Sequence, residues 1–453
     1  MRLNVVLIVI DTLRADHLGC YGYFRDTSPT IDRIAREGVL FENFYASGIP
    51  TGPGFTSIIT GLYPINHKYY ITPWDVPNAY QMDDNIPVLA EFLWDSGYTT
   101  AAIDNLINFR SHMKHFVRGY EYYINPTRSS KWIHHHVTAS EINRRLIPWI
   151  RQHSYERFFL FIHYWDPHMP YNQPKAYRDI FRHKELKDLE VVKAPAGYDY
   201  VPGWGKADDI PKGNDFKSVD LYDGEILYVD YAISEVVSVL KDEGILDETL
   251  LIITSDHGEQ LGQHGIWGHA GLHEAVIKVP LIMRCPKILP QGIRVKEYAQ
   301  HVDIVPTILN LVNVKTEASF DGDDLLKLIR GESIRDFVIC ETWGERCIVK
   351  GEWKLIIHYE PELRMLRDVF AFNGHFRDWL PFLKKYGNIG VELYNIKQDP
   401  AEIINLANEQ ADIVKELKDL LDSWIKFKLK GKEDPILSLK QYTQPQPKEY
   451  QSL

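Results

Sequence analysis

Cysteine is scarce in this sequence. Only four of its 453 residues are cysteines, at positions 20, 285, 340 and 347, and no two of them form a CxxC pair. Small secreted domains that depend on disulfide bonds contain many more cysteines. The sparse and irregular spacing excludes a disulfide scaffold and favours reduced thiols, as in a cytosolic protein.

Long apolar runs and blocks of basic residues are also absent. No segment approaches the ~20 apolar residues of a membrane span. The N-terminus lacks the layout of a signal peptide, because Asp11 interrupts a short apolar run and no cleavage site follows. Asp and Glu outnumber Lys and Arg by 62 to 51, which gives a net charge of −11. These features predict a cytoplasmic protein without a membrane span and without a surface for nucleic acids.

The remaining composition is that of an ordinary globular protein. Apolar residues make up 45% and charged residues 25% of the chain, which rules out wholesale disorder. Aromatic residues reach 12%, with 26 Tyr and 11 Trp, and suit deep, partly polar pockets. At about 150 residues per domain, the length allows two or three domains, or one large α/β domain with an appendage.

Three short apolar runs predict buried parallel strands, and acidic or imidazole side chains follow each run. The runs are rich in β-branched and aromatic residues, as expected of strands that helices cover on both faces. Ligands of open α/β sheets bind beyond the carboxyl ends of the strands. We therefore expect the polar groups to converge on one edge of a sheet. The runs are Val5–Ile10, before Asp11; Phe158–Ile162, before His163, Asp166 and His168; and Leu250–Thr254, before Asp256 and His257.

Amphipathic segments alternate with these runs. Apolar residues recur at helical spacing in residues 30–38, 86–97 and 222–240, and the first two segments end in Gly, a common residue at helix C-termini. Strands that alternate with helices predict a doubly wound α/β fold, with a mostly parallel central sheet sandwiched by helices.

The character of the sequence changes after about Gly331, where short strand candidates and one amphipathic helix follow one another. We expect a main domain at residues 1–331, a smaller α+β C-terminal domain with a short antiparallel sheet at 332–431, and an extended tail at 432–453. Residues 171–220 are predicted to form a lid over the active edge. An aromatic-rich insertion occupies residues 363–383.

Several segments have a recognisable order and spacing over nearly the whole chain: NVVLIVIDTLRADHLGCYGY, TSPTIDRIAREGVLFENFYASG, TGPGFTSIITGLYP, GYTTAAID, HYWDPHMPY, YDGEILYVD, TSDHGEQLGQHGIWGHAGLHEAVIKVPLIMR, HVDIVPTIL, KGEWKLI and ELYNIKQDPAEIINLA. Together they resemble the sulfatase family of the alkaline phosphatase superfamily. The resemblance implies an alkaline-phosphatase-like fold and a metal-dependent hydrolase of phosphate or sulfate esters.

Position by position, the resemblance implies that Asp11, Thr51, Asp256 and His257 bind a divalent metal ion. The family often has two adjacent acids at the first of these positions, whereas here the second residue is Thr12. Calcium prefers an all-oxygen shell, while an imidazole suits Mn or Zn. We therefore expect one Mn or Zn ion rather than Ca, and a second metal ion stays open because other histidines lie nearby in the sequence.

The residue at the family's nucleophile position is Thr51. In sulfatases a Cys or Ser at this position is converted to formylglycine; Thr cannot undergo this modification, and Phe55 replaces the usual Arg of the motif. Thr51 instead resembles the unmodified threonine nucleophile of nucleotide phosphodiesterases and phosphoethanolamine transferases. Pro53 predicts the first turn of a helix, which would place the Thr51 hydroxyl at a positive helix end beside the metal ion. An inert helix cap is the plain alternative.

Four further residues are predicted to act at the substrate. His168 matches the family's substrate-side histidine and is expected, with His269, to contact substrate oxygens or protonate the leaving group. His269 and Asn105 stand where many members have lysines, and His264 lies near His269 in the sequence. Fewer lysines mean less positive charge in the pocket, which favours a monoanionic diester or phosphonate monoester over a dianionic monoester. Water can also attack a phosphothreonine in line, whereas a sulfothreonine would need a second displacement at sulfur.

The leading hypothesis is a metal-dependent hydrolase of phosphate-type esters, acting on a small-molecule phosphate or sulfate ester. Three alternatives stay open: a sulfuric ester hydrolase, a transferase of phospho-headgroups, and a non-catalytic metal-binding relative. The Pro- and Gln-rich tail suggests a homo-oligomer in which the tail lies across a neighbouring subunit, although a frayed terminus explains it at least as well.

Overall fold

The centre of the molecule is an eight-stranded sheet that is parallel except at one strand. The computed structural model describes residues 3–70, 82–106, 111–127, 137–181, 200–201, 205–206, 215–261, 263–265, 267–342, 344–359 and 390–438. The strands of the sheet are β1 (Asn4–Ile10), β2 (Val39–Tyr45), β3 (Thr99–Ile103), β4 (Tyr122–Ile124), β5 (Phe158–Tyr164), β8 (Thr249–Thr254), β11 (Leu281–Arg284) and β12 (Ile293–Gln300). Their order is β12-β2-β11-β8-β1-β5-β3-β4, and only β11 runs antiparallel to its neighbours.

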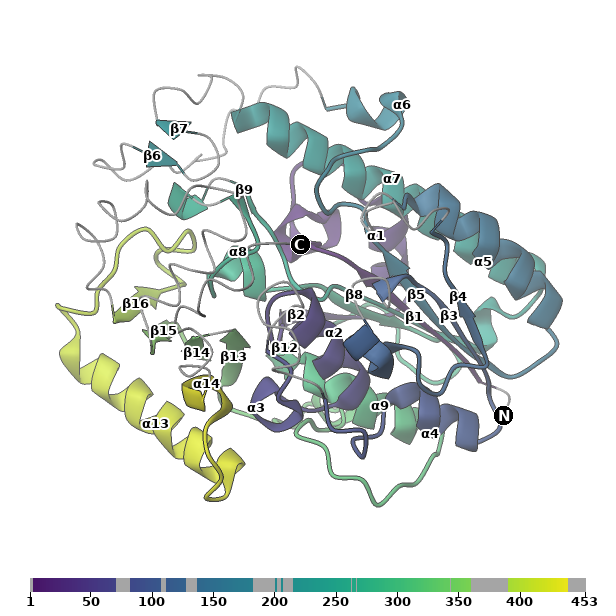
Figure 1. The fold of residues 1–453 in the computed structure, drawn as a ribbon. Coiled ribbons are helices and arrows are strands. Elements are labelled where there is room, and N and C mark those ends of the chain that lie inside the picture. The colour runs from purple at the N-terminus through teal and green to yellow at the C-terminus, as the bar shows by residue number, and fades with distance from the viewer. Residues whose placement is uncertain are drawn as a thin grey trace, which may run out of the picture.

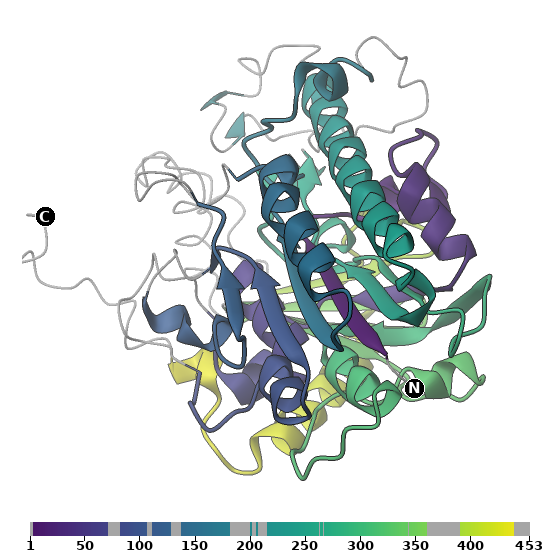
Figure 2. The same cartoon turned by 90° about the vertical axis from the view of Figure 1, so that its right-hand side faces the viewer.

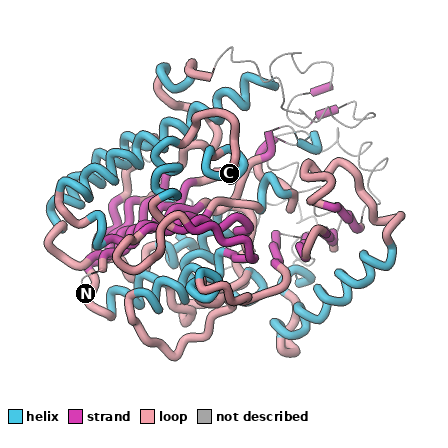
Figure 3. The backbone as a smooth tube through the Cα atoms, turned by 180° about the vertical axis from the view of Figure 1, so that it is seen from behind, coloured by secondary structure: helices cyan, strands magenta, loops and turns pink. Residues whose placement is uncertain are grey.

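Helices cover both faces of this sheet. On one face lie α1 (Pro29–Arg36), α5 (Ala139–His153) and α7 (Asp215–Asp242), which pack on one another. On the other face lie α2 (Thr51–Thr60), α4 (Leu89–Asp95) and α9 (Ile304–Leu311), as Figures 1 and 2 show. From behind, the strands form a continuous band between the two helical layers (Figure 3). The predicted fold class, with its mostly parallel sheet sandwiched by helices, is confirmed.

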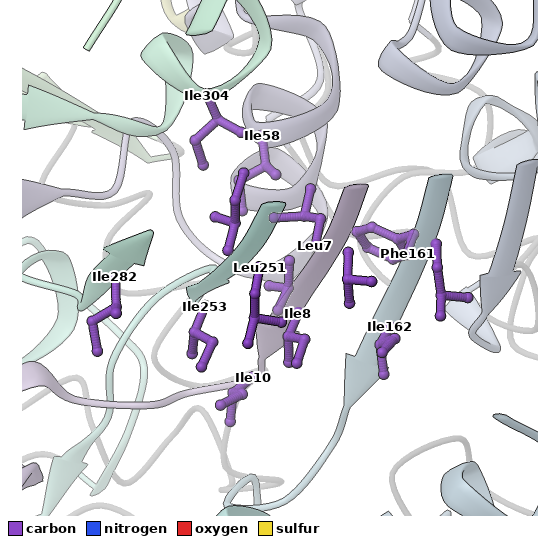
Figure 4. Close-up of a cluster of buried hydrophobic side chains, with 14 of the residues drawn as sticks. Leu7, Ile8, Ile10, Ile58, Phe161, Ile162, Leu251, Ile253, Ile282 and Ile304 are labelled. Atoms are coloured by element: carbon purple, nitrogen blue, oxygen red, sulfur yellow. The ribbon is translucent and has the colours of Figure 1, made fainter. Parts of the chain in front are cut away.

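The core forms because alternate residues of each central strand point to opposite helical layers. All seven residues of β1 are buried. Figure 4 shows Leu7 directed toward Ile58 of α2, whereas Ile8 points to the opposite side of the sheet. A strand with both faces covered has no polar face, which explains the uninterrupted apolar run in the sequence.

A second, antiparallel sheet forms the C-terminal region. It consists of β13 (Val338–Thr342), β14 (Glu345–Lys350), β15 (Trp353–His358) and β16 (Val391–Asn395), in that order. Helix α13 (Ala411–Leu429) covers one face with Leu417 and Leu421. The other face packs against the main domain, with Cys340 and Cys347 in a cluster that includes Ile49. The predicted short antiparallel sheet of this region is thereby confirmed.

The main domain and the C-terminal sheet also join through backbone hydrogen bonds. The amide of Glu341 in β13 donates to the carbonyl of Ser47 at 3.1 Å, and the amide of Ile49 donates to the carbonyl of Glu341 at 2.9 Å. A β-bridge between Gly48 and Glu341 results. The C-terminal sheet therefore holds the loop that leads into α2.

The remaining elements are short and lie mostly between the larger ones. They are the helices α3 (Pro64–His67), α6 (Lys175–Arg178), α8 (Glu274–Ile277), α10 (Leu326–Ile329) and α14 (Pro435–Ser438), and the strands β6 (Tyr200–Val201), β7 (Gly205–Lys206), β9 (Gln260–Leu261) and β10 (Trp267–Gly268). Turns of 3₁₀ helix occur at Ala15–His17, Gly19–Tyr21, Ser111–Phe116, Leu246–Glu248, Gln263–Gly265 and His301–Asp303.

Several predicted features fall wholly or partly outside the described residues. These are most of the lid at 171–220, the insertion at 363–383 and the end of the tail. The start of the tail is helical rather than extended, because the carboxylate of Asp434 accepts the amide of Ile436 and anchors α14. The four cysteines are free thiols. Among the described helices, none has both the length and the apolar character that crossing a bilayer requires.

Candidate active site

The sheet brings the ends of three strands together, as the sequence predicts. Strands β8, β1 and β5 are neighbours and run parallel (Figure 1), with Val9 beside both Thr254 and His163. The residues that follow β1 and β8 therefore meet at one edge. The amide of Thr12 donates to Oδ1 of Asp256 at 3.2 Å, which fixes the two loops against each other.

Asp11, Asp256 and His257 form a compact buried group at this edge. One ligand atom from each lies within 4.8 Å of the others. Nε2 of His257 is 3.3 Å from Oδ2 of Asp256 and 4.0 Å from Oδ1 of Asp11. In the described part of the chain, it is the one group of three or more acidic, His or Cys side chains with this spacing.

The atoms of this group are arranged to bind a cation. Oδ1 of Asp11 and Oδ2 of Asp256 are buried and accept no hydrogen bond from the described residues, and the one donor close to Oδ2 of Asp11 among them is Nε2 of His163 at 3.4 Å. Burial and the neighbouring Asp11 carboxylate raise the pKa of Asp256 well above its usual value. A divalent ion between the two carboxylates would remove this penalty, because it neutralises both charges.

The imidazole of His257 is held in the form that binds metals. Its Nδ1 donates to the carbonyl oxygen of Gly258 at 2.8 Å, so the lone pair of Nε2 faces the two carboxylates. Burial, with a contribution from His269, lowers the pKa of His257 to about 3. Two carboxylates and one neutral imidazole are a donor set that fits a divalent ion.

Thr51 lies beside this group at the first position of α2. It is 6% exposed, and its Oγ1 is 3.2 Å from Nε2 of His257. The helix can approach Asp256 and His257 because Gly54 has no side chain: a Cβ there would lie 2.8 Å from the carbonyl oxygen of Asp256. The Thr51 hydroxyl therefore lies at the positive end of a helix and next to an imidazole lone pair.

Two further histidines continue from His257 as a row of rings. The centroid of His269 is 4.6 Å from that of His257 and 5.3 Å from that of His168. Nδ1 of His269 lies 3.2 Å from Oε2 of the buried Glu259. His168 is half-buried and bonds through Nδ1 to the carbonyl of Met169. The structure thus places both predicted substrate-side histidines next to the group of Asp11, Asp256 and His257.

Comparison with known proteins identifies the family. A family model described as "Sulfatase" matches residues 3–314, more than half of the chain. The chain belongs to the sulfatase family. A second model, described as "N-sulphoglucosamine sulphohydrolase, C-terminal", matches residues 262–426. The family resemblance predicted from sequence is confirmed, and the chain is an ester hydrolase of the alkaline phosphatase superfamily.

Relatives of this sulfatase-family chain carry names from both ester classes. It is 25% identical to the Multifunctional alkaline phosphatase superfamily protein PehA of Trinickia caryophylli, over 82% of this chain and 81% of that protein. It is also 25% identical to an arylsulfatase of Clostridium perfringens, over 96% of each. The phosphonate monoester hydrolase of Agrobacterium radiobacter has the same fold, with a TM-score of 0.75 at 20% identity, covering 94% of this chain and 96% of that one.

Two of the predicted substrate residues have contacts outside the row of histidines in this sulfatase-family structure. Asn105 is buried, and its carboxamide accepts a hydrogen bond from Trp165 Nε1 and donates one to Thr127. His264 stacks on His273 with a centroid distance of 3.7 Å and lines a cavity of about 1060 Å³ next to the C-terminal sheet. Asn105 thus connects strand-end loops, and His264 is not part of the Asp11 group.

Sequence reasoning did not identify Asp104 and Glu259, and it placed His163 at this edge of the sheet without assigning it a partner. His163 lies between Asp104 and Asp11, and Glu259 supports His269. Burial on its own lowers the pKa of His163, but Asp104 and Asp11 raise it to about 9. The only sequence signal was their position after predicted strands. It could not reveal which side chains pair, because Asp104 follows β3 whereas His163 lies at the end of β5.

Proposed function

We propose that the chain is a metal-dependent hydrolase of phosphate-type esters, with monoanionic phosphodiesters or phosphonate monoesters as its substrate class. The observation that carries the proposal is the position of Thr51, with its Oγ1 at 3.2 Å from Nε2 of His257 and at the start of α2. Thr51 would be the nucleophile, and Asp11, Asp256, His257 and Thr51 would hold a divalent ion. That ion would lower the pKa of the Thr51 hydroxyl and neutralise charge on the ester.

The reaction would proceed in two displacements at phosphorus. Oγ1 of Thr51 loses its proton to water and forms a bond to phosphorus, while the bond from phosphorus to the leaving alcohol breaks. His168 or His269 gives the departing oxygen its proton. A water molecule then attacks the phosphothreonine in line, and the released Thr51 oxygen regains a proton. This second displacement at phosphorus does not need the formylglycine that sulfatases use.

The charge of the site supports a monoanionic substrate. The side chains that act most strongly on the charge of Asp11 are the imidazoles of His163, His168 and His257, and no lysine or arginine is among them. At two positions where many family members carry lysine, this chain has Asn105 and His269. The carboxamide of Asn105 is hydrogen-bonded to Trp165 and Thr127, and His269 contacts Glu259. A site with less fixed positive charge stabilises a diester better than a dianionic monoester.

Rapid acid quench followed by intact-mass analysis tests the proposal. With bis(4-nitrophenyl) phosphate as a slow substrate, a covalent phosphoryl adduct on the peptide containing Thr51 is expected. The matched control is Thr60→Val, because Thr60 is a buried threonine at the far end of the same helix. Turnover without an adduct, and with a fully active Thr51→Ala variant, would contradict the nucleophile assignment.

Hydrolysis of sulfate esters is the second candidate, favoured by the family match and by the arylsulfatase relative. Parallel assays of nitrophenyl sulfate, nitrophenyl phosphate, bis-nitrophenyl phosphate and a phenylphosphonate ester separate the classes. We expect the highest kcat/KM for the diester or the phosphonate. A preference for the sulfate ester by about tenfold or more would replace the phosphate proposal with the sulfatase one.

A further inference from the structure

The two carboxylate oxygens of Asp11 face different partners. Oδ1 lies toward the group that it forms with Asp256 and His257, at 4.0 Å from Nε2 of His257. Oδ2 lies on the side of His163, at 3.4 Å from Nε2 of that ring. Oδ2 and the Nε2 atom of His163 are both buried, and neither has another hydrogen-bond partner among the described residues.

The imidazole of His163 is held firmly in this position. Its Nδ1 lies 2.8 Å from Oδ1 of Asp104, while Oδ2 of Asp104 accepts the hydroxyl of Tyr123 at 2.6 Å and the amide of Leu106 at 3.0 Å. The rings of Phe55 and Trp165 pack against the imidazole, with centroids at 4.7 and 4.6 Å. Asp104 therefore orients His163 through Nδ1, and the aromatic rings restrict its rotation.

We propose that Asp104 and His163 are positioning residues for the metal site: His163 donates from Nε2 to Oδ2 of Asp11 and leaves Oδ1 to bind the ion. The inference rests on the metal site of the proposed function. His163 is a donor to Asp11 rather than a further ligand, because it is not part of the group whose ligand atoms lie within 4.8 Å of one another. Atoms that share one ion lie closer together than this.

Removal of such an outer partner weakens a metal site without removing a ligand. A carboxylate that is free to rotate loses part of its pre-set orientation, and loss of a supporting hydrogen bond typically costs about 10–100-fold in metal affinity. His163→Leu removes the donor and should weaken Mn²⁺ binding by about this factor. His163→Gln keeps an N–H donor and should recover part of the affinity, and Asp104→Asn should show a smaller loss.

Calorimetric titration of the metal-free, full-length variants with Mn²⁺ is the direct test. The matched control is His273→Gln, because His273 is also buried with Nε2 near a carboxylate, Glu392 at 3.3 Å, but lies outside the Asp11 group. It should bind Mn²⁺ like the wild type. Wild-type affinity in His163→Leu would overturn this inference alone, whereas a wild-type protein that binds no Mn²⁺ would overturn the proposed function as well.

X-ray absorption spectroscopy of the wild-type protein loaded with Zn²⁺ provides a measurement that needs no variant. The proposal expects scattering from one imidazole, that of His257. Two coordinated imidazoles would contradict the single-imidazole site on which the assignment of His163 as a donor rests. This count decides the question even if the His163→Leu variant does not fold.

Discussion

Oγ1 of Thr51 lies 3.2 Å from Nε2 of His257, although 206 positions separate the two residues in the sequence. Nδ1 of this imidazole is occupied by the carbonyl of Gly258, so the Thr51 hydroxyl is the donor of the pair. One atom, Nε2, thus faces both the hydroxyl and the two carboxylates. Any cation that binds the imidazole there also lies beside the proposed nucleophile.

Substitution of Thr51 should separate a nucleophile from a helix cap. Thr51→Ala is expected to lower kcat/KM by at least about 10³-fold, since it removes the attacking oxygen. Thr51→Ser should keep a measurable fraction of the activity because it retains a hydroxyl at the same helix end. Steady-state kinetics with a nitrophenyl diester, alongside Thr60→Val, are the measurement. A loss of about tenfold or less in Thr51→Ala would point to a cap or a minor ligand.

Metal removal should abolish activity, and Mn²⁺ or Zn²⁺ should restore it better than Ca²⁺. Elemental analysis of protein purified without chelator should find a transition metal. Stoichiometric calcium alone would contradict the ligand assignment.

Asp256→Asn should have opposite effects on metal binding and on the stability of the metal-free protein. The variant should no longer bind the metal tightly, because it loses a carboxylate ligand. Without metal it should melt at a higher temperature than the wild type, since one of two adjacent buried carboxyl groups no longer ionises. Each kcal/mol gained would raise the melting temperature by about 1 °C, because the entropy of unfolding grows with chain length. A lower melting temperature than the metal-free wild type would show that the Asp11–Asp256 repulsion is unimportant.

A buried carboxyl pair next to the His168 loop should make stability depend on pH. Burial and the neighbouring Asp166 raise the pKa of Glu225 to about 10, whereas a Glu in an unfolded chain has its ordinary pKa of 4.5. Between these values the folded state holds a proton that the unfolded state releases, so stability falls as pH rises. Glu225→Gln removes this titration and should gain stability relative to the wild type from pH 5 to 9.

Melting temperatures measured across this pH range provide the test. The control is Glu235→Gln, a partly buried carboxylate on the same helix that accepts a hydrogen bond from Asn143. If the melting temperatures of the wild type and of Glu225→Gln change with pH in the same way, Glu225 does not hold the extra proton in the folded state.

Arg346 should be one of the most sensitive positions for stability. It is fully buried, its Nε donates to Glu341 at 2.7 Å, and its other nitrogens bond to both oxygens of Asp434. Arg346→Met leaves two acids without their partner and should cost about 3–5 kcal/mol of unfolding free energy. The exposed pair of Lys350 and Glu416 provides the control, because Lys350→Met should cost less than about 1 kcal/mol. Urea unfolding compares them, and equal costs would refute the argument.

The sequence predicts those parts of the fold that have a strong local pattern. Strands β1, β5 and β8 are uninterrupted apolar runs because both of their faces are covered. Strand β12 lies at the edge of the sheet with a largely exposed, mixed sequence, so its apolar pattern is too weak to identify. Local pattern thus reveals the centre of the sheet more readily than its edges.

The candidate site likewise has residues that the sequence predicts and contacts that it does not. The residues that follow the predicted strands include Asp11, Asp256 and His257, and parallel topology brings them together. The partners of these residues depend on packing between distant loops. The hydrogen bonds of the Asn105 carboxamide with Trp165 and Thr127 are an example, since no local pattern indicates them. Similarly, the Asp104–His163 contact arises only when β3 and β5 lie side by side, which no local pattern expresses.

The bridge between Gly48 and Glu341 determines when the candidate site can form during synthesis of the chain. The loop before Thr51 is completed by backbone groups of a residue that leaves the ribosome almost three hundred positions later. A growing chain therefore carries its proposed nucleophile long before the strand that fixes it is available. Contacts of such sequence separation form late in folding, so the emerging polypeptide should gain activity only after β13 has been synthesised and paired.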